Sequence, residues 1–89
     1  MKDKLEKELI DGISLVEMSS YREKVLIDLK EKIKTPSRIA KSTKIGTSHV
    51  STALKELKEK KLVVCLNPEK KQGRLYKITT LGEKVLKYI

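Results

Sequence analysis

The chain has 89 residues, a net charge of +9 at pH 7 and an isoelectric point near 9.7. This length predicts one domain, residues 1–89, and the positive charge favours an anionic partner without naming it. A single cysteine, Cys65, excludes an internal disulfide framework and fits a reducing cytoplasm. The charged first residues exclude a signal peptide and no apolar run has transmembrane length, so we expect a soluble, cytoplasmic protein without a membrane partner.

Residues 1–18 predict an N-terminal helical segment that is acidic overall. Its apolar residues recur at helical spacing, at Leu5, Leu9, Ile13 and Val16. Gly12 predicts a break or bend, and residues 13–18 could instead form a short extended piece. Because residues 1–20 carry a net charge of −2, this segment should face away from nucleic acid, and its apolar stripe could contact the core or a second subunit.

A second helix is predicted from Ser20 to about Lys32. Ser20 followed by Glu23 is the pattern of a capping box, in which both side chains bond to free backbone N–H groups. The expected buried stripe is Val25, Leu26, Leu29 and Ile33. Tyr21 is expected to pack its ring, and a phosphate contact from its hydroxyl is the alternative.

Residues 35–61 predict two helices joined by a tight turn, and carry most of the excess charge: residues 34–61 have a net charge of +6. The predicted caps and turn are Thr35 and Pro36 for the first helix, Gly46 with positive φ for the turn, and Thr47 or Ser48 for the second helix. The first helix has the apolar residues Ile39 and Ala40. The second helix should bury Val50, Ala53, Leu54 and Leu57, which share one face.

The outer face of that second helix is unusual because its first half has small hydroxyl side chains rather than long charged ones. Ser48, Thr52, Lys55 and Glu59 fall opposite the buried stripe, with His49 and Ser51 on the flanks. Small polar side chains allow close approach to base edges and phosphates, as in a helix-turn-helix that enters the major groove. A plain helical hairpin without a nucleic-acid partner is the alternative.

Residues 62–79 predict a β-hairpin, and residues 80–89 a final helix. The β-branched run 62–66 and the alternating run 74–79 should form its two strands, which need the helices for support. The connecting loop is basic, with a net charge of +3 over residues 67–77. Thr79 is the expected cap of the final helix.

The order helix, helix-turn-helix, hairpin, helix is that of a winged helix, mainly α with a small β-hairpin wing. Three segments resemble the compact archaeal helix-turn-helix regulators related to the MarR and ArsR groups: SSYREKVLIDL, TPSRIAKSTKIGTSHVSTALKELKEKKLV and NPEKKQGRLYKITTLGEKVL. The resemblance extends from Ser19 to about Lys87, and its most specific part is the exit from the wing, Tyr76-x-Ile78-Thr79-x-x-Gly82. It implies a second helix that reads the major groove and a wing tip on the backbone or in the minor groove.

The same resemblance implies the DNA-binding residues. They are Ser48, His49, Ser51, Thr52 and Lys55 on the reading helix, and Lys70, Lys71 and Arg74 on the wing; Thr47, Arg38 and Lys44 complete the predicted set. Thr52 stands where the family usually has an arginine, which removes the commonest guanine contact, so a weaker or differently directed sequence preference is expected. The long dimerisation helices of full-length MarR proteins are absent, although the apolar stripes near both termini predict a homodimer.

The predicted function is therefore a sequence-specific regulator of transcription that binds double-stranded DNA. A protein-interaction or RNA-binding winged helix is the alternative; the former should show apolar anchors and the latter aromatic platforms, for which Tyr76 is the candidate near the wing. One histidine and one cysteine do not make a metal site, the glycines form no phosphate-binding loop and no nucleophile–base pair is evident, so neither cofactor nor enzyme activity is predicted. Cys65 is interpreted as a small packing residue.

Overall fold

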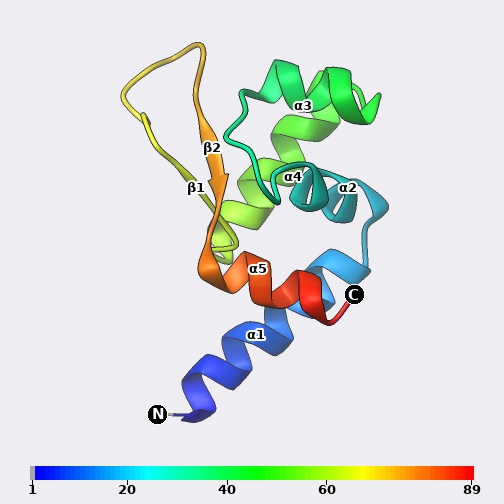
Figure 1. Ribbon diagram of the computed structural model, residues 1–89, viewed down its shortest axis with the longest axis vertical. Coiled ribbons are helices and arrows are strands. Elements are labelled where there is room, and N and C mark those ends of the chain that lie inside the picture. The colour runs from blue at the N-terminus through cyan, green and yellow to red at the C-terminus, as the bar shows by residue number, and fades with distance from the viewer. Residues whose placement is uncertain (1) are drawn as a thin grey trace.

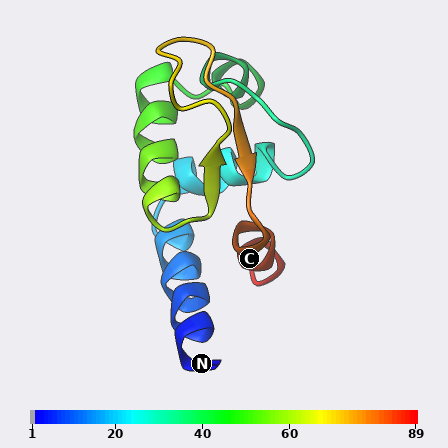
Figure 2. The same ribbon diagram turned by 90° about the vertical axis from the view of Figure 1, so that its left-hand side faces the viewer.

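The computed structural model describes residues 2–89, with side chains from residue 6 onward. Its elements in chain order are α1 (Lys2–Glu17), α2 (Ser20–Asp28), α3 (Pro36–Thr43), α4 (Thr47–Glu59), β1 (Val63–Cys65), β2 (Tyr76–Ile78) and α5 (Thr80–Lys87). Helices α2, α3 and α4 pack together next to the hairpin, while α1 runs away from them beside α5 (Figure 1 and Figure 2). The predicted fold class, mainly α with a small β-hairpin, is confirmed.

Helix α4 is central to the core because its apolar stripe is fully enclosed. The four residues predicted to be buried, Val50, Ala53, Leu54 and Leu57, are each at most 2% exposed. Around them lie the buried side chains of the other elements, among them Val16, Val25, Leu26, Leu29, Ile39, Leu62 and Val85. Since the stripe defines which side of α4 faces inward, it also determines which side chains α4 presents to solvent.

Helix α1 continues through Gly12, so the predicted break is wrong, and so is the alternative of an extended piece at residues 13–18. A Cβ at Gly12 would lie 3.0 Å from side-chain atoms of both Leu62 and Val85. The glycine therefore allows close packing of α1 against α5 rather than ending the helix. Val16 is fully buried, and the Leu5 side chain, also predicted to lie on this stripe, falls outside the described residues.

Helix α2 differs from its prediction at both ends. Its N-cap is Ser19 rather than Ser20, and the Ser19 hydroxyl accepts from the Arg22 N–H at 3.4 Å, so the predicted capping box is wrong by one residue. The helix ends at Asp28 rather than near Lys32. Ile33, predicted to be buried, is 50% exposed because the chain has already left the helix and runs toward the hairpin.

The turn between α3 and α4 has the predicted place but not the predicted chemistry. Lys44 takes the left-handed conformation (φ 61°, ψ 26°), whereas Gly46 has φ −58° and is the N-cap of α4. Neither Thr47 nor Ser48 caps the helix; both are in its first turn. The Thr43 hydroxyl stabilises the turn instead, because it donates to the Ile39 carbonyl oxygen at 2.6 Å and accepts from the backbone N–H that follows Lys44.

The two strands are shorter than predicted, and a third segment joins them. β1 and β2 pair antiparallel with Cys65 opposite Tyr76. On the other side of β2, Lys34 forms an isolated bridge with Tyr76, with N–O distances of 3.2 and 2.9 Å. The sequence pattern did not indicate this bridge, which joins the start of the helix-turn-helix to the hairpin.

Both predicted caps that flank this unit are confirmed. The Thr35 hydroxyl accepts from the Arg38 N–H at 3.3 Å, with Pro36 at the first helical position, and the Thr79 hydroxyl accepts from the Gly82 N–H at 3.0 Å. Thr79 Oγ1 also lies 2.7 Å from the Lys61 carbonyl oxygen, which ties the start of α5 to the segment before β1. The hairpin is thus anchored at its base by a side chain outside the strands.

Candidate nucleic-acid interface

A groove of about 530 Å³ separates the helix-turn-helix from the loop of the hairpin. Its residues come from three places: the first turn of α3, one flank of α4, and the loop between β1 and β2, hereafter the wing. They are Pro36, Ser37, Thr47, Ser51, Leu54, Lys55, Lys58, Lys71, Gln72, Gly73, Arg74 and Tyr76. The groove therefore unites parts of the chain that are far apart in sequence.

One flank of α4 forms the helical wall of this groove. Thr47, Ser51, Lys55 and Lys58 follow each other at intervals of three or four residues and so lie along one line of the helix. All four are exposed. The short hydroxyl side chains stand at the N-terminal end of the helix and the lysines toward its C-terminal end, so the wall becomes more cationic along its length.

The outermost ridge of α4 carries Ser48 and Thr52, both exposed as predicted. The Thr52 hydroxyl donates to the Ser48 backbone carbonyl oxygen at 3.0 Å. Its proton is therefore engaged within the helix, while its methyl group and the remaining acceptor capacity of its oxygen stay available to a ligand.

The flank of α4 away from the wing contacts α2. The His49 ring is exposed but stacks on Tyr21, with ring centroids 4.5 Å apart and an angle of 26° between the planes. Two helical turns further along α4, Glu56 Oε1 lies 2.8 Å from Nε of Arg22, the residue after Tyr21. The hydrogen bond from Arg22 holds the pKa of the Glu56 carboxyl below its ordinary value of 4.5, even though partial desolvation opposes the shift. The stacking on Tyr21 orients His49 at the beginning of α4, and the Arg22–Glu56 pair joins α2 to the same flank further along.

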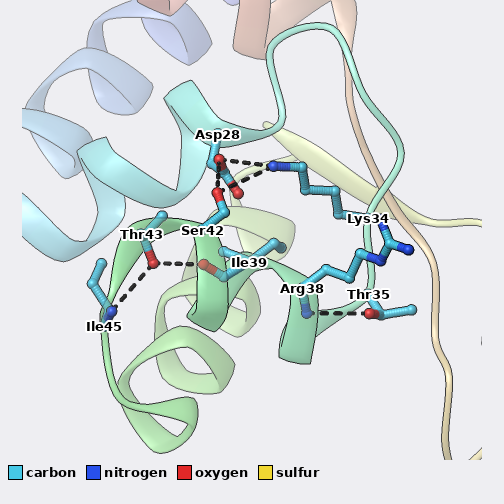
Figure 3. Close-up of polar contacts among 8 residues, drawn as sticks. All are labelled: Asp28, Lys34, Thr35, Arg38, Ile39, Ser42, Thr43 and Ile45. Atoms are coloured by element: carbon cyan, nitrogen blue, oxygen red, sulfur yellow. Dashed lines mark hydrogen bonds and ion pairs between the residues drawn. The ribbon is translucent and has the colours of Figure 1, made fainter.

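A polar cluster connects α3 to α2 and to the sheet (Figure 3). Lys34 Nζ lies 2.9 Å from Asp28 Oδ1 and 3.2 Å from the Ser42 hydroxyl, and Ser42 donates to the same Asp28 oxygen. Both charged side chains of the ion pair are 15% exposed. Because the backbone of Lys34 also pairs with β2, one residue holds α2, α3 and the hairpin in a common arrangement.

The predicted residues divide between the groove and its surroundings. Thr47, Ser51, Lys55, Lys71 and Arg74 line the groove together, whereas Ser48, His49, Thr52, Lys44, Lys70 and Arg38 lie outside its lining. Arg38 lines a separate hollow beside Lys41, and Lys44 is exposed in the turn. All of the predicted residues except the half-buried Arg74 are exposed.

Sequence reasoning missed Lys58, Ser37 and Gln72, which also line the groove. Helical spacing could have identified Lys58, because it lies three residues after Lys55 and on the line that begins at Thr47. Ser37 and Gln72 carry no such signal, since their positions depend on how α3 and the wing pack.

The charged side chains described in the groove all carry positive charge. Among the described residues, four cationic side chains line it, namely Lys55, Lys58, Lys71 and Arg74, and no aspartate or glutamate does. Cations on two facing walls create a positive potential where a phosphate backbone would be attracted. Within the described part of the chain, no group of three His, Cys, Asp or Glu side chains could hold a metal ion, and no helix is long and apolar enough to cross a membrane.

Comparison with solved structures yields a match to ZitR of Lactococcus lactis, determined as a double mutant. The TM-score is 0.69, and the sequences are 31% identical over a match that covers 79% of this chain and 49% of the ZitR chain. The chain has a winged-helix fold. It spans about half the length of the ZitR chain that it matches. No protein-family model matches the chain, and no curated protein matches it.

Proposed function

We propose that this winged helix is a regulator of transcription that binds double-stranded DNA in a sequence-specific manner. The observation that carries the proposal is the cationic groove between α4 and the wing, with lysines on the helical wall and Lys71 and Arg74 on the wing wall. A duplex fits this arrangement because α4 can enter the major groove while the wing contacts the adjacent backbone or the minor groove.

Helix α4 supports this assignment through the shape of its exposed surface. The N-terminal end of α4, which would enter the major groove of DNA first, carries Thr47, Ser48 and Ser51. Their side chains are short enough to let the helix backbone approach the base edges. Lys55 stands further along and suits a phosphate contact, since its ammonium group is a mobile point charge. Base discrimination then depends on hydroxyl and methyl groups, with the Thr52 methyl group directed at a thymine methyl.

We also propose that the chain is a regulator of the archaeal type that resembles the MarR and ArsR groups. The 31% identity to ZitR supports a regulator of that general kind. Binding of DNA duplex, RNA duplex and single strands, measured in parallel with the wild-type protein, tests the proposal. Preference for duplex DNA supports it, whereas preference for either RNA form or failure to bind any nucleic acid contradicts it. Selection from a random DNA duplex library then yields the operator motif.

A homodimer is the second part of the proposal. The terminal stripes predicted from the sequence are largely covered within the chain, since Val16 and Val85 are fully buried. Exposed apolar side chains nevertheless remain near the termini: Ile10 is 60%, Tyr88 66% and Ile89 42% exposed. Light scattering at micromolar concentration should give twice the chain mass. Such a dimer would place two recognition helices about 34 Å apart on the operator. A monomer in both the presence and the absence of DNA contradicts the homodimer alone.

A further inference from the structure

The wing is a closed loop rather than a flexible tip. Its residues, 66–75, connect β1 to β2, and a loop of this length at the surface would ordinarily sample many conformations. Here the two limbs are held together at the base, where the Leu66 N–H donates to the Leu75 carbonyl oxygen at 2.8 Å. Gly73 takes a φ of +69°, which allows the chain to reverse direction at the tip.

The side chain of Asn67 closes the loop above this base. Its Nδ2 donates to the Gly73 carbonyl oxygen at 3.2 Å, and its Oδ1 accepts from the Leu75 N–H at 2.7 Å. The Asn67 backbone carbonyl oxygen also accepts from the Lys70 N–H at 3.0 Å. One half-buried amide thus bonds to the backbone on both sides of Arg74, which lies between Gly73 and Leu75.

Arg74 is held in the same closed form. Its Nε donates to the Lys70 carbonyl oxygen at 2.6 Å, while among the described residues no hydrogen-bond partner is recorded for its two terminal nitrogens. The side chain lines the groove opposite α4. Guanidinium nitrogens that remain free in a restrained arginine are suited to two parallel bonds with a phosphate.

We propose that Asn67 is a positioning residue of the DNA-binding surface, which acts by holding the wing closed and Arg74 in the groove before DNA arrives. This inference rests on the proposed function and deepens it, because it assigns a determinant of affinity to an uncharged residue that need not touch DNA. Ordering a mobile loop upon binding reduces affinity, and a loop that is ordered in advance avoids that loss. Asn67→Ala leaves every charge in place but opens the loop.

The test is a double-mutant cycle on duplex-DNA affinity, with the wild type, Asn67→Ala, Arg74→Ala and the double variant. We expect Asn67→Ala to weaken binding about five- to tenfold in the wild-type background. Within the Arg74→Ala background the same change should cost less than about twofold, because the residue that it positions is gone. The slope of log affinity against log salt should not change with Asn67→Ala, because no charge is removed.

Leu66→Ala is the matched control, since Leu66 is the uncharged neighbour of Asn67 in the same loop, is 47% exposed, lies outside the groove lining and keeps its backbone hydrogen bond to Leu75 in the variant. It should change the affinity less than about twofold. Trypsin digestion of the free proteins supplies an independent measurement, with cleavage after Lys70, Lys71 and Arg74 several-fold faster in Asn67→Ala. Circular dichroism verifies that the helices are retained.

Three results would overturn the inference: no loss of affinity with Asn67→Ala, an equal loss in the two Arg74 backgrounds, or unchanged trypsin cleavage of the loop. Each leaves the proposed function intact, since the wild type still binds duplex DNA. Failure of the wild-type protein to bind duplex DNA refutes the proposed function and this inference together. The two failures are therefore distinguishable.

Discussion

Two lysines from opposite walls of the groove provide the sharpest test of the proposed DNA contact. Lys58 is on the α4 wall and Lys71 on the wing wall. The perturbation is the double variant Lys58→Ala/Lys71→Ala. Its matched control is Lys84→Ala/Lys87→Ala on α5, where both lysines are exposed and line a different hollow beside Lys30. Each double variant lowers the net charge from +9 to +7, so a difference between them reflects position rather than total charge.

The expected magnitude follows from the number of phosphate contacts removed. Each contact contributes about 0.9 to the slope of log affinity against log salt, so the groove variant should lose about 1.8 units of slope. Between about 50 and 200 mM salt, a fourfold change, the wild-type affinity should therefore fall about twelvefold more than that of the groove variant. The α5 variant should retain the wild-type slope, since α5 lies beside α1 and away from the wing tip (Figure 1 and Figure 2), where salt screens its charge.

Fluorescence anisotropy with a labelled duplex at four or more salt concentrations measures the slopes, and thermal unfolding verifies that both variants fold. Equal reductions of slope in the two double variants would mean that net charge alone attracts DNA. An unchanged slope in the groove variant would mean that neither wall of the groove contacts the phosphate backbone. Either result refutes the proposal that the cationic groove contacts the phosphate backbone of DNA.

Further predictions concern recognition, packing and pH. Thr52→Ala should weaken binding to the selected site by about 1 kcal/mol and leave scrambled DNA unaffected, whereas Lys55→Ala should weaken both equally; equal losses for Thr52→Ala would exclude α4 as the reader. Gly82→Ala should reduce the free energy of unfolding in urea by about 1–3 kcal/mol, because the added Cβ would overlap the Leu62 carbonyl oxygen and approach a side-chain carbon to 2.7 Å. An unchanged urea midpoint would contradict this close packing. Glu56→Gln should destabilise the protein at neutral pH. The difference from wild type should shrink as the pH falls below about 4.5 and through the lowered pKa of Glu56, because protonation ends its ion pair. A difference that persists in acid would disprove that linkage.

The sequence by itself determined the features that depend on neighbouring residues. Thr35 and Pro36 mark the start of α3, and Thr79 caps α5, because a helix cap needs only a side chain and the N–H groups of the next turn. The stripe that begins at Val50 predicted which side of α4 is buried, since helical periodicity is a property of contiguous residues. The exposed ridge of Ser48 and Thr52 follows from that stripe.

Local patterns gave the wrong prediction for two glycines, Gly12 and Gly46, whose roles depend on the surrounding structure. Gly12 reads as a helix breaker, but its lack of a side chain serves the contact with Leu62 and Val85, so the helix continues. Gly46 reads as the residue with positive φ, yet Lys44 takes that conformation, and Thr43 stabilises the turn through bonds to both sides. The left-handed residue of this turn is therefore a lysine, and glycine serves as the N-cap of α4 instead.

Only the tertiary structure decided which residues meet across the groove. The bridge between Lys34 and Tyr76 sets the wing beside the helix-turn-helix, and no periodic pattern connects residues so far apart in sequence. Lys58 and Lys71 line one groove only because of that arrangement, and the side chain of Asn67 closes the wing only because the hairpin brings Gly73 back to it. Caps and stripes are local and can be read from the chain, whereas a binding surface built from separate elements exists only after those elements have packed.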